Sequence, residues 1–238
     1  MKNEGILLTV IIPVLNEERT IDTILDRVLA VDMDKEIIVV DDGSTDKTPE
    51  ILARRVNDRI RALTHPQNKG KGAAIQTALP HARGIYTIIQ DGDLEYDPND
   101  YHKIMNVMHE KNAQVVFGSR ILGKQPMSYL RYWLGGRGVT WFTNLLFRSR
   151  LTDEPTCYKM FETELLKSLN LECPGFEFCP EVTGKILKRN IPIYETPIHY
   201  NPRSLEEGKK INWKDGFIAL WTLLMIRLTG RPCLRKHR

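Results

Sequence analysis

The chain has 238 residues, of which 42% are hydrophobic and 27% are charged, as is typical of a folded soluble protein. Its 34 basic and 30 acidic residues leave a net charge of +4. The basic residues form no long stripe interleaved with base-stacking aromatic residues, so nucleic acid is excluded as a partner. The four cysteines form no C-x-x-C pair, which argues against a zinc site and favours a reducing compartment.

Strand and helix patterns alternate along the first half of the chain. The first apolar run is short and leads into an acidic loop, so it predicts a strand rather than a signal peptide. A helix with Thr20 as its N-cap follows, and a second helix is predicted to have Thr48 as its cap and Pro49 as its first residue. Strands are predicted over residues 7–13, 36–40, 59–65, 85–90 and 113–120. These strand–helix units predict an α/β fold with a right-handed, mostly parallel sheet and helices on both faces.

Unusual polar segments follow each predicted strand. They are, in chain order, "NEE", "DDGSTD", "QNKGKG", "DGDLE" and "GSR". Because ligands of open α/β sheets bind beyond the carboxyl ends of the strands, these segments are the candidate functional site.

The fourth of these segments predicts a metal site. Asp91 and Asp93 converge if the chain stays extended, and Glu95 joins them if the extension continues. Gly92 allows a backbone or a ligand to approach closely. Paired hard oxygen donors suit Mg²⁺ or Mn²⁺, which share their remaining positions with water and phosphate. Asp97, by contrast, is interpreted as a helix cap.

A second acidic segment, "VVDDGSTDKT", ends the second predicted strand. A carboxylate there can accept hydrogen bonds from a nucleobase edge or from ribose hydroxyls. The alternative is a capped turn, because Ser44, Asp46 and Thr48 are good turn and cap residues. A nucleoside diphosphate that bridges this segment and the metal site accounts for both segments together.

The ordered motifs "IIPVLNEE", "VVDDGSTDKT", "NKGKGAA", "QDGDLEYDP", "GSR" and "LTDEPTCYKMF" resemble the family 2 glycosyltransferases, which have a GT-A fold. Within that family, the chain is similar to the dolichyl-phosphate mannosyltransferase type of polyprenyl-phosphate glycosyltransferase, over almost its whole length. The family often has Gln where Glu95 stands and an aromatic residue where Leu15 stands. The resemblance implies Asp91, Asp93 and Glu95 as metal ligands, and as donor-binding residues Pro13, Leu15, Glu17, Asp41, Asp42, Lys69, Asp91, Arg203 and Lys209.

The resemblance implies an inverting, metal-dependent transfer of a hexose from a nucleotide sugar, of the GDP-mannose or UDP-glucose type, to a polyprenyl phosphate. A phosphate monoester needs no general base because it is largely dianionic at pH 7, but it does need arginines. Arg120 and Arg137 match the family's acceptor-phosphate positions. Arg203 with Lys209 or Lys210 belongs to a basic loop near the donor, and Asp153 matches an aspartate near the metal.

Two apolar segments with arginines or charged ends, residues 128–151 and 214–230, are predicted to lie at a lipid surface or to be ordinary core helices. Neither segment holds the ~20 uninterrupted apolar residues that span a bilayer, so a peripheral protein on the cytoplasmic side of the membrane is expected. The predicted division is a GT-A catalytic domain over residues 1–205, with an acceptor and membrane segment at about 126–151, followed by a basic loop and amphipathic helix over 206–238. The alternatives are a soluble family 2 enzyme that acts on a sugar or protein hydroxyl, and a non-catalytic membrane-bound scaffold.

Overall fold

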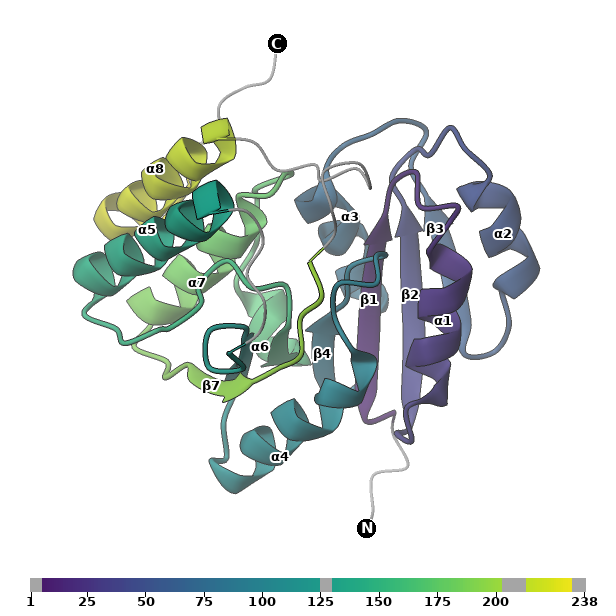
Figure 1. The fold of residues 1–238 in the computed structure, drawn as a ribbon, viewed down its shortest axis with the longest axis horizontal. Coiled ribbons are helices and arrows are strands. Elements are labelled where there is room, and N and C mark those ends of the chain that lie inside the picture. The colour runs from purple at the N-terminus through teal and green to yellow at the C-terminus, as the bar shows by residue number, and fades with distance from the viewer. Residues whose placement is uncertain (1–5, 125–129, 203–212, 233–238) are drawn as a thin grey trace.

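The structure is a computed structural model that describes residues 6–124, 130–202 and 213–232 (Figure 1). The chain forms a seven-stranded sheet in the order β3-β2-β1-β4-β6-β5-β7. The strands are β1 (Leu8–Val14), β2 (Lys35–Asp41), β3 (Ile60–Thr64), β4 (Tyr86–Ile89), β5 (Val115–Ser119), β6 (Lys159–Glu162) and β7 (Tyr194–Pro197). The five predicted strands are therefore confirmed within two residues at each end, and the sheet is mostly parallel as expected.

The centre of the sheet forms from the most apolar runs. β2 is buried along its whole length, and β1 pairs in parallel with both β2 and β4. Strands covered on both faces are expected to be continuously apolar, which is why "LTVIIPV" was readable as a central strand. The carboxyl ends of β1, β2 and β4 consequently meet at one edge of the sheet.

Helices cover both faces of the sheet (Figure 1). They are α1 (Ile21–Ala30), α2 (Thr48–Arg55), α3 (Lys71–Ala78), α4 (Tyr101–Glu110), α5 (Leu130–Phe147), α6 (Thr163–Ser168), α7 (Phe178–Lys188) and α8 (Trp213–Thr229), with short 3₁₀ helices at η1 (Leu79–His81) and η2 (Pro98–Asp100). The chain moves outward from β1 to β3 and then back to β4, so right-handed crossovers put α3 on the face opposite α1 and α2. The turn that enters α3 lies beside the strand ends.

The predicted caps were partly wrong. Thr20 occupies the N-cap position of α1, but its hydroxyl donates to the carbonyl oxygen of Gly92 at 2.9 Å instead of capping the helix. Thr48 is the first residue of α2 rather than its cap, and its Oγ1 accepts from the backbone N–H of Glu17 at 2.9 Å. Both hydroxyls tie loops from different strands together. Asp97 does cap η2, through the backbone N–H of Asn99.

Three helices that follow β5 pack against one another. α5 and α8 contact each other and both contact α7, and Figure 1 shows α5 and α8 side by side at the end of the molecule away from α2. No helix within the described residues is both long and apolar enough to cross a membrane. Among those residues Cys157, Cys173 and Cys179 are free thiols.

Candidate active site

The end of β4 is held by a buried cluster of tyrosines. The side-chain carbonyl of Gln90 accepts hydrogen bonds from the hydroxyls of Tyr101 and Tyr158, at 2.6 and 2.7 Å. Its amide donates to the backbone carbonyl of Asp91 at 3.0 Å. Gln90 is completely buried, so this network fixes the point at which the chain leaves the sheet and presents Asp91.

The acidic segment after β4 bends immediately. Asp91 forms an ion pair with Lys71, the first residue of α3. Asp93 accepts from the backbone N–H of Glu95 at 3.1 Å, and Glu95 accepts from the hydroxyl of Tyr200 at 3.0 Å. The expectation that the extended chain continues to Glu95 is therefore wrong, because residues 92–95 form a bend.

The carboxylates do not form a complete metal cage by themselves. In the described part of the chain, no group of three or more His, Cys, Asp or Glu side chains is placed to hold a metal ion, so Glu95 does not complete a set with Asp91 and Asp93 there. Two carboxylates at one strand end still suit Mg²⁺ or Mn²⁺, which bind through one or two carboxylates when phosphate oxygens supply the rest. The donor set present thus fits a metal that arrives with a diphosphate.

Lys71 keeps its charge although it is largely buried. Burial lowers the pKa of its ammonium, but Asp91 more than compensates and the pKa lies well above its ordinary value. Only 14% of the Lys71 side chain and 25% of the Asp91 side chain are exposed. The ammonium therefore supplies the positive charge that offsets the repulsion within the acidic segment.

The two aspartates at the end of β2 have different roles. The carboxylate of Asp42 accepts from the backbone N–H groups of Lys69 and Gly70, at 2.9 and 2.7 Å, and lies 2.6 Å from Nδ1 of His65. Asp42 therefore shapes the glycine loop. Asp41 accepts from the backbone N–H of Ser44 through Oδ1, while its buried Oδ2 has no hydrogen-bond partner in the part of the chain that the structure describes.

The loops after β1 and β2 brace each other. Asn16 has a positive φ of 53°, and its side-chain oxygen accepts from the backbone N–H of Thr45 at 2.8 Å. The two oxygens of Asp46 accept from the backbone N–H groups of Thr48 and Glu18. Ser44 accepts from the backbone N–H of Asn16 at 2.8 Å, so polar side chains of "STDKT" do hold the turn, although Thr48 is not the helix cap.

The remaining residues of the first donor loop lie at the end of β1. Pro13 is inside the strand, paired with Val40, rather than in the loop that follows. Leu15 is half-buried beyond the strand end, and Glu17 accepts from the hydroxyl of Thr20 at 2.9 Å.

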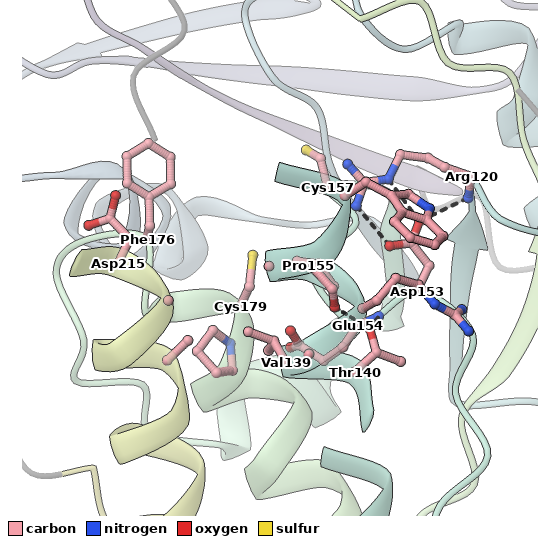
Figure 2. A pocket seen from close by; sticks show the side chains of 18 of the residues that line it. Arg120, Val139, Thr140, Asp153, Glu154, Pro155, Cys157, Phe176, Cys179 and Asp215 are labelled. Atoms are coloured by element: carbon pink, nitrogen blue, oxygen red, sulfur yellow. Dashed lines mark hydrogen bonds and ion pairs between the residues drawn. The ribbon is translucent and has the colours of Figure 1, made fainter. Parts of the chain in front are cut away.

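Arg120 follows β5 and is held by Asp153. Its Nε and Nη2 atoms donate to the two carboxylate oxygens of Asp153 at 2.8 and 2.7 Å, and its backbone N–H donates to the same group (Figure 2). The guanidinium lies 5.1 Å from the ring centre of Tyr200. Burial raises the pKa of Asp153, but Arg120 outweighs this effect and the pKa is lowered, so Asp153 is an ionised counter-ion.

These groups open into one cavity of about 680 Å³ (Figure 2). Its polar side includes Lys71, Asp91, Arg120 and Asp153, and Arg137 of α5 lies on its wall. The apolar side is formed by α5, α7, α8 and the loops beside them, and includes Trp133, Val139, Pro155, Phe176, Pro180, Phe217, Ala219 and Leu220. A charged end and an apolar end in one cavity suit an amphiphilic ligand.

Sequence reasoning missed several residues of this cavity. Lys71, rather than the exposed Lys69, reaches Asp91, and Tyr200 comes from the segment after β7 to contact Glu95. Glu195 orients the Asp153 loop by accepting from the backbone N–H groups of Thr152 and Asp153. Glu195 and Tyr200 come close to the site because β7 lies beside β5 in the sheet, and no local motif in the sequence reveals that strand order. Arg203, Lys209 and Lys210 lie outside the described residues.

Glu154 is another residue that sequence reasoning missed. It lines the cavity and is fully buried, and neither carboxyl oxygen has a hydrogen-bond partner among the described residues. Burial raises the pKa of Glu154 above 4.5, although Lys159 acts in the opposite direction. The folded protein therefore binds this proton more tightly than the unfolded chain, and the stability that protonation provides is lost as the pH rises from about 4.5 through the folded pKa.

Glu154→Gln is expected to raise the melting temperature at pH 8 and to change it much less at pH 4, below the pKa of the unfolded chain. Glutamine resembles the protonated acid and removes the buried negative charge present at pH 8, which is worth ~1–3 kcal/mol, at about 2–4 °C per kcal/mol in a protein of this size. Thermal unfolding at both pH values checks this, with Glu164→Gln on the surface of α6 as the control. Equal shifts at the two pH values would contradict the assignment.

The chain matches known proteins over nearly all of its length. The model of the family "Glycosyl transferase family 2" matches residues 9–168. The low-salt glycan biosynthesis hexosyltransferase Agl6 of Haloferax volcanii is 32% identical over 231 residues, which cover 94% of this chain and 54% of the relative. The chain thus spans about half of that relative's length.

Two other relatives are matched over two thirds or more of their own length. The UDP-N-acetylglucosamine–dolichyl-phosphate N-acetylglucosaminyltransferase of Methanococcus voltae is 29% identical over 247 residues, which cover 93% of this chain and 96% of the relative. The dolichyl-phosphate beta-glucosyltransferase of Dictyostelium discoideum is 29% identical over 222 residues, which cover 83% of this chain and 67% of the relative.

Solved structures support the fold. The glucosyl-3-phosphoglycerate synthase of Mycobacterium tuberculosis, in complex with phosphoglyceric acid, superposes with a TM-score of 0.72 at 21% identity, over 95% of this chain and 81% of the other. Sequence match and superposition agree: the chain belongs to glycosyl transferase family 2 and has the GT-A fold expected from its motifs.

Proposed function

We propose that the protein transfers a hexose from a nucleoside diphosphate sugar to the phosphate of a polyprenol of the dolichyl type. The observation that carries this proposal is the single cavity that joins the charged strand ends to an apolar wall of α5, α7 and α8. A lipid phosphate has the same two-part chemistry. The names of the M. voltae and D. discoideum relatives, both of which include dolichyl-phosphate, support the same acceptor class.

The donor is proposed to bind between the ends of β2 and β4. The Oδ2 of Asp41, which has no partner among residues 6–124, 130–202 and 213–232, is a buried acceptor suited to the N–H edge of a nucleobase. Asp91 and Asp93 are proposed to hold Mg²⁺ or Mn²⁺ with the diphosphate, and structures of the M. tuberculosis enzyme with Mn²⁺ and UDP or Mg²⁺ and UDP support this metal class. When bound, the metal neutralises charge on the departing diphosphate.

The acceptor phosphate is proposed to bind at Arg120 and Arg137. In Arg120, Nε and Nη2 are directed at Asp153, and Nη1, which has no hydrogen-bond partner among the described residues, is proposed to bind an anion in the cavity. The ionised Asp153 orients the guanidinium and is not needed as a base, because the phosphate is already dianionic. A phosphate oxygen forms a bond to the anomeric carbon as the bond to the diphosphate breaks, which inverts the anomeric centre.

Incubation with Mn²⁺, a sugar-nucleotide panel and short polyprenyl phosphates, followed by mass spectrometry of the lipids, tests this function. The panel includes UDP-glucose, UDP-N-acetylglucosamine and GDP-mannose. A lipid that gains the mass of one hexosyl or N-acetylhexosaminyl group is expected. Transfer to free sugars or phosphoglycerate without transfer to the lipid would instead establish a soluble-acceptor enzyme.

A membrane surface is the proposed partner of α5 and α8. Leu134, Trp141 and Leu145 share one face of α5, since they are separated by whole helical turns, and they are 55%, 66% and 62% exposed. Phe217, Trp221 and Leu228 likewise share one face of α8 and are 66%, 52% and 69% exposed. The exposed arginines beside them match anionic lipid: Arg137, Arg148, Arg150, Arg227 and Arg231.

The double variant Trp141→Ser, Trp221→Ser is expected to bind vesicles of mixed anionic and zwitterionic lipid at least about tenfold more weakly than wild type, since each buried aromatic side chain contributes roughly 1.5–3 kcal/mol. Vesicle co-sedimentation at low salt measures this. The matched control is Val56→Ser, which removes an equally exposed apolar residue at the end of α2. Unchanged binding of the double variant would exclude this surface.

A further inference from the structure

The backbone of Lys71, a residue that lines the cavity, is fixed by its neighbours. It is the first residue of α3, and Gly70 before it has a φ of 99°. A side chain at Gly70 would place its Cβ 2.4 Å from the carbonyl oxygen of Pro174, and Ala73 donates its backbone N–H to that same carbonyl at 2.9 Å. The backbone that carries Lys71 is therefore fixed against the loop before α7, and the lysine side chain provides the remaining freedom.

The ammonium of Lys71 occupies a position that a metal would need. Its Nζ is paired with Oδ1 of Asp91 and lies 3.7 Å from Sγ of Cys157. A divalent ion that binds Asp91 through this oxygen requires the lone pairs that now accept from the ammonium. Lysine and metal therefore compete for one carboxylate oxygen.

Displacement of the lysine requires a new partner for its charge. The pair is largely buried, and an unpaired ammonium in such a place is strongly unfavourable. The diphosphate of the donor brings negative charge to the same end of the cavity. A long, flexible lysine side chain can reach a phosphate as a point charge without movement of the backbone.

We infer that Lys71 is the counter-ion of Asp91 in the metal-free protein and transfers to the donor's diphosphate when metal and donor bind together. This inference rests on the proposed function. It makes Lys71 a positioning residue that couples the two ligands: metal alone binds weakly because it must displace the lysine, and the diphosphate restores metal binding by accepting the ammonium. Coupling between two ligands is reciprocal and typically amounts to about 5- to 150-fold in affinity.

Electron paramagnetic resonance titration of Mn²⁺, with and without UDP, tests the coupling on the full chain. Lys71→Met is expected to bind Mn²⁺ alone about tenfold more tightly than wild type does. With Mn²⁺ bound, the variant is expected to bind UDP more weakly than wild type does. Most of the coupling between the two ligands therefore disappears. Lys71→Arg keeps the positive charge and is expected to bind Mn²⁺ alone as weakly as wild type. A merely structural role would weaken both ligands together.

The control is Lys103→Met, which removes the α4 lysine that pairs with Asp100 of η2 and is expected to change neither affinity. If Lys71→Met does not fold, as judged by circular dichroism, Lys71→Gln replaces it and is expected to shift Mn²⁺ affinity in the same direction. If the folded neutral variant binds Mn²⁺ as weakly as wild type, or more weakly, the inference is overturned. The proposed function then still stands, provided that wild type binds Mn²⁺. Absence of Mn²⁺ binding by wild type, with and without UDP, overturns both.

Discussion

Asp93→Ala is expected to reduce sugar transfer by about 10³-fold while the protein stays folded. A metal ion stabilises the charge of the leaving diphosphate by several kcal/mol, and each 1.4 kcal/mol corresponds to a factor of ten. Asp93 is half-buried at the surface of the site. Initial rates with saturating Mn²⁺, after removal of trace metals, measure the loss.

Asp93 is a better choice than Asp91 for this experiment. Removal of Asp91 leaves the largely buried Lys71 without its ion-pair partner, so a loss of activity would be mixed with a loss of stability. The matched control is Asp97→Ala, which removes an acid of the same segment that only caps η2. It is expected to cost about 1 kcal/mol of stability and no activity. Wild-type turnover by Asp93→Ala would refute the metal assignment.

Arg120→Lys is expected to lower kcat/KM for the lipid phosphate by ~10²-fold and to leave UDP affinity unchanged. Lysine keeps the charge that Asp153 requires, but it cannot bind the carboxylate through two donors and a phosphate through a third. Arg120→Ala would be less informative, because it leaves Asp153, which is 3% exposed, as an unpaired buried charge.

Steady-state kinetics with the acceptor and donor varied separately distinguish the two possible roles of Arg120. The control is Arg83→Lys, since Arg83 also pairs with a buried carboxylate, that of Glu36. This pair lies at the amino ends of the strands, away from the candidate site. It is expected to retain kcat/KM. If Arg120→Lys weakens UDP binding and leaves the acceptor KM unchanged, Arg120 belongs to the donor site.

The first five strands could be predicted because each is a local apolar run that a turn or cap ends. β6 and β7 could not, since "KMFE" and "YETP" mix charged and apolar residues and are recognisable as strands only through their neighbours. β6 lies between β4 and β5 and is antiparallel to both, so strands that are consecutive in the predicted pattern are separated in the sheet. Pairing of this kind depends on long-range packing, which sequence periodicity does not contain.

The candidate site could be located from the sequence but not resolved in detail. The carboxyl ends of parallel strands bring Asp41, Asp91 and Arg120 to one edge, and the motifs identify them. The motifs do not reveal that Asp42 is used internally by His65 and the glycine loop, because adjacent aspartates look alike in sequence. They also do not distinguish Lys69, which is exposed, from Lys71, which is largely buried and paired with Asp91.

Anomalous diffraction at the manganese edge, from crystals that contain Mn²⁺ and UDP, tests the central claim most directly. The account predicts one peak at bonding distance from carboxylate oxygens of Asp91 and Asp93 and from the diphosphate, with the Lys71 ammonium moved from Asp91 to a phosphate oxygen. A peak that contacts neither aspartate, with Lys71 still paired to Asp91 and UDP bound elsewhere, would contradict it.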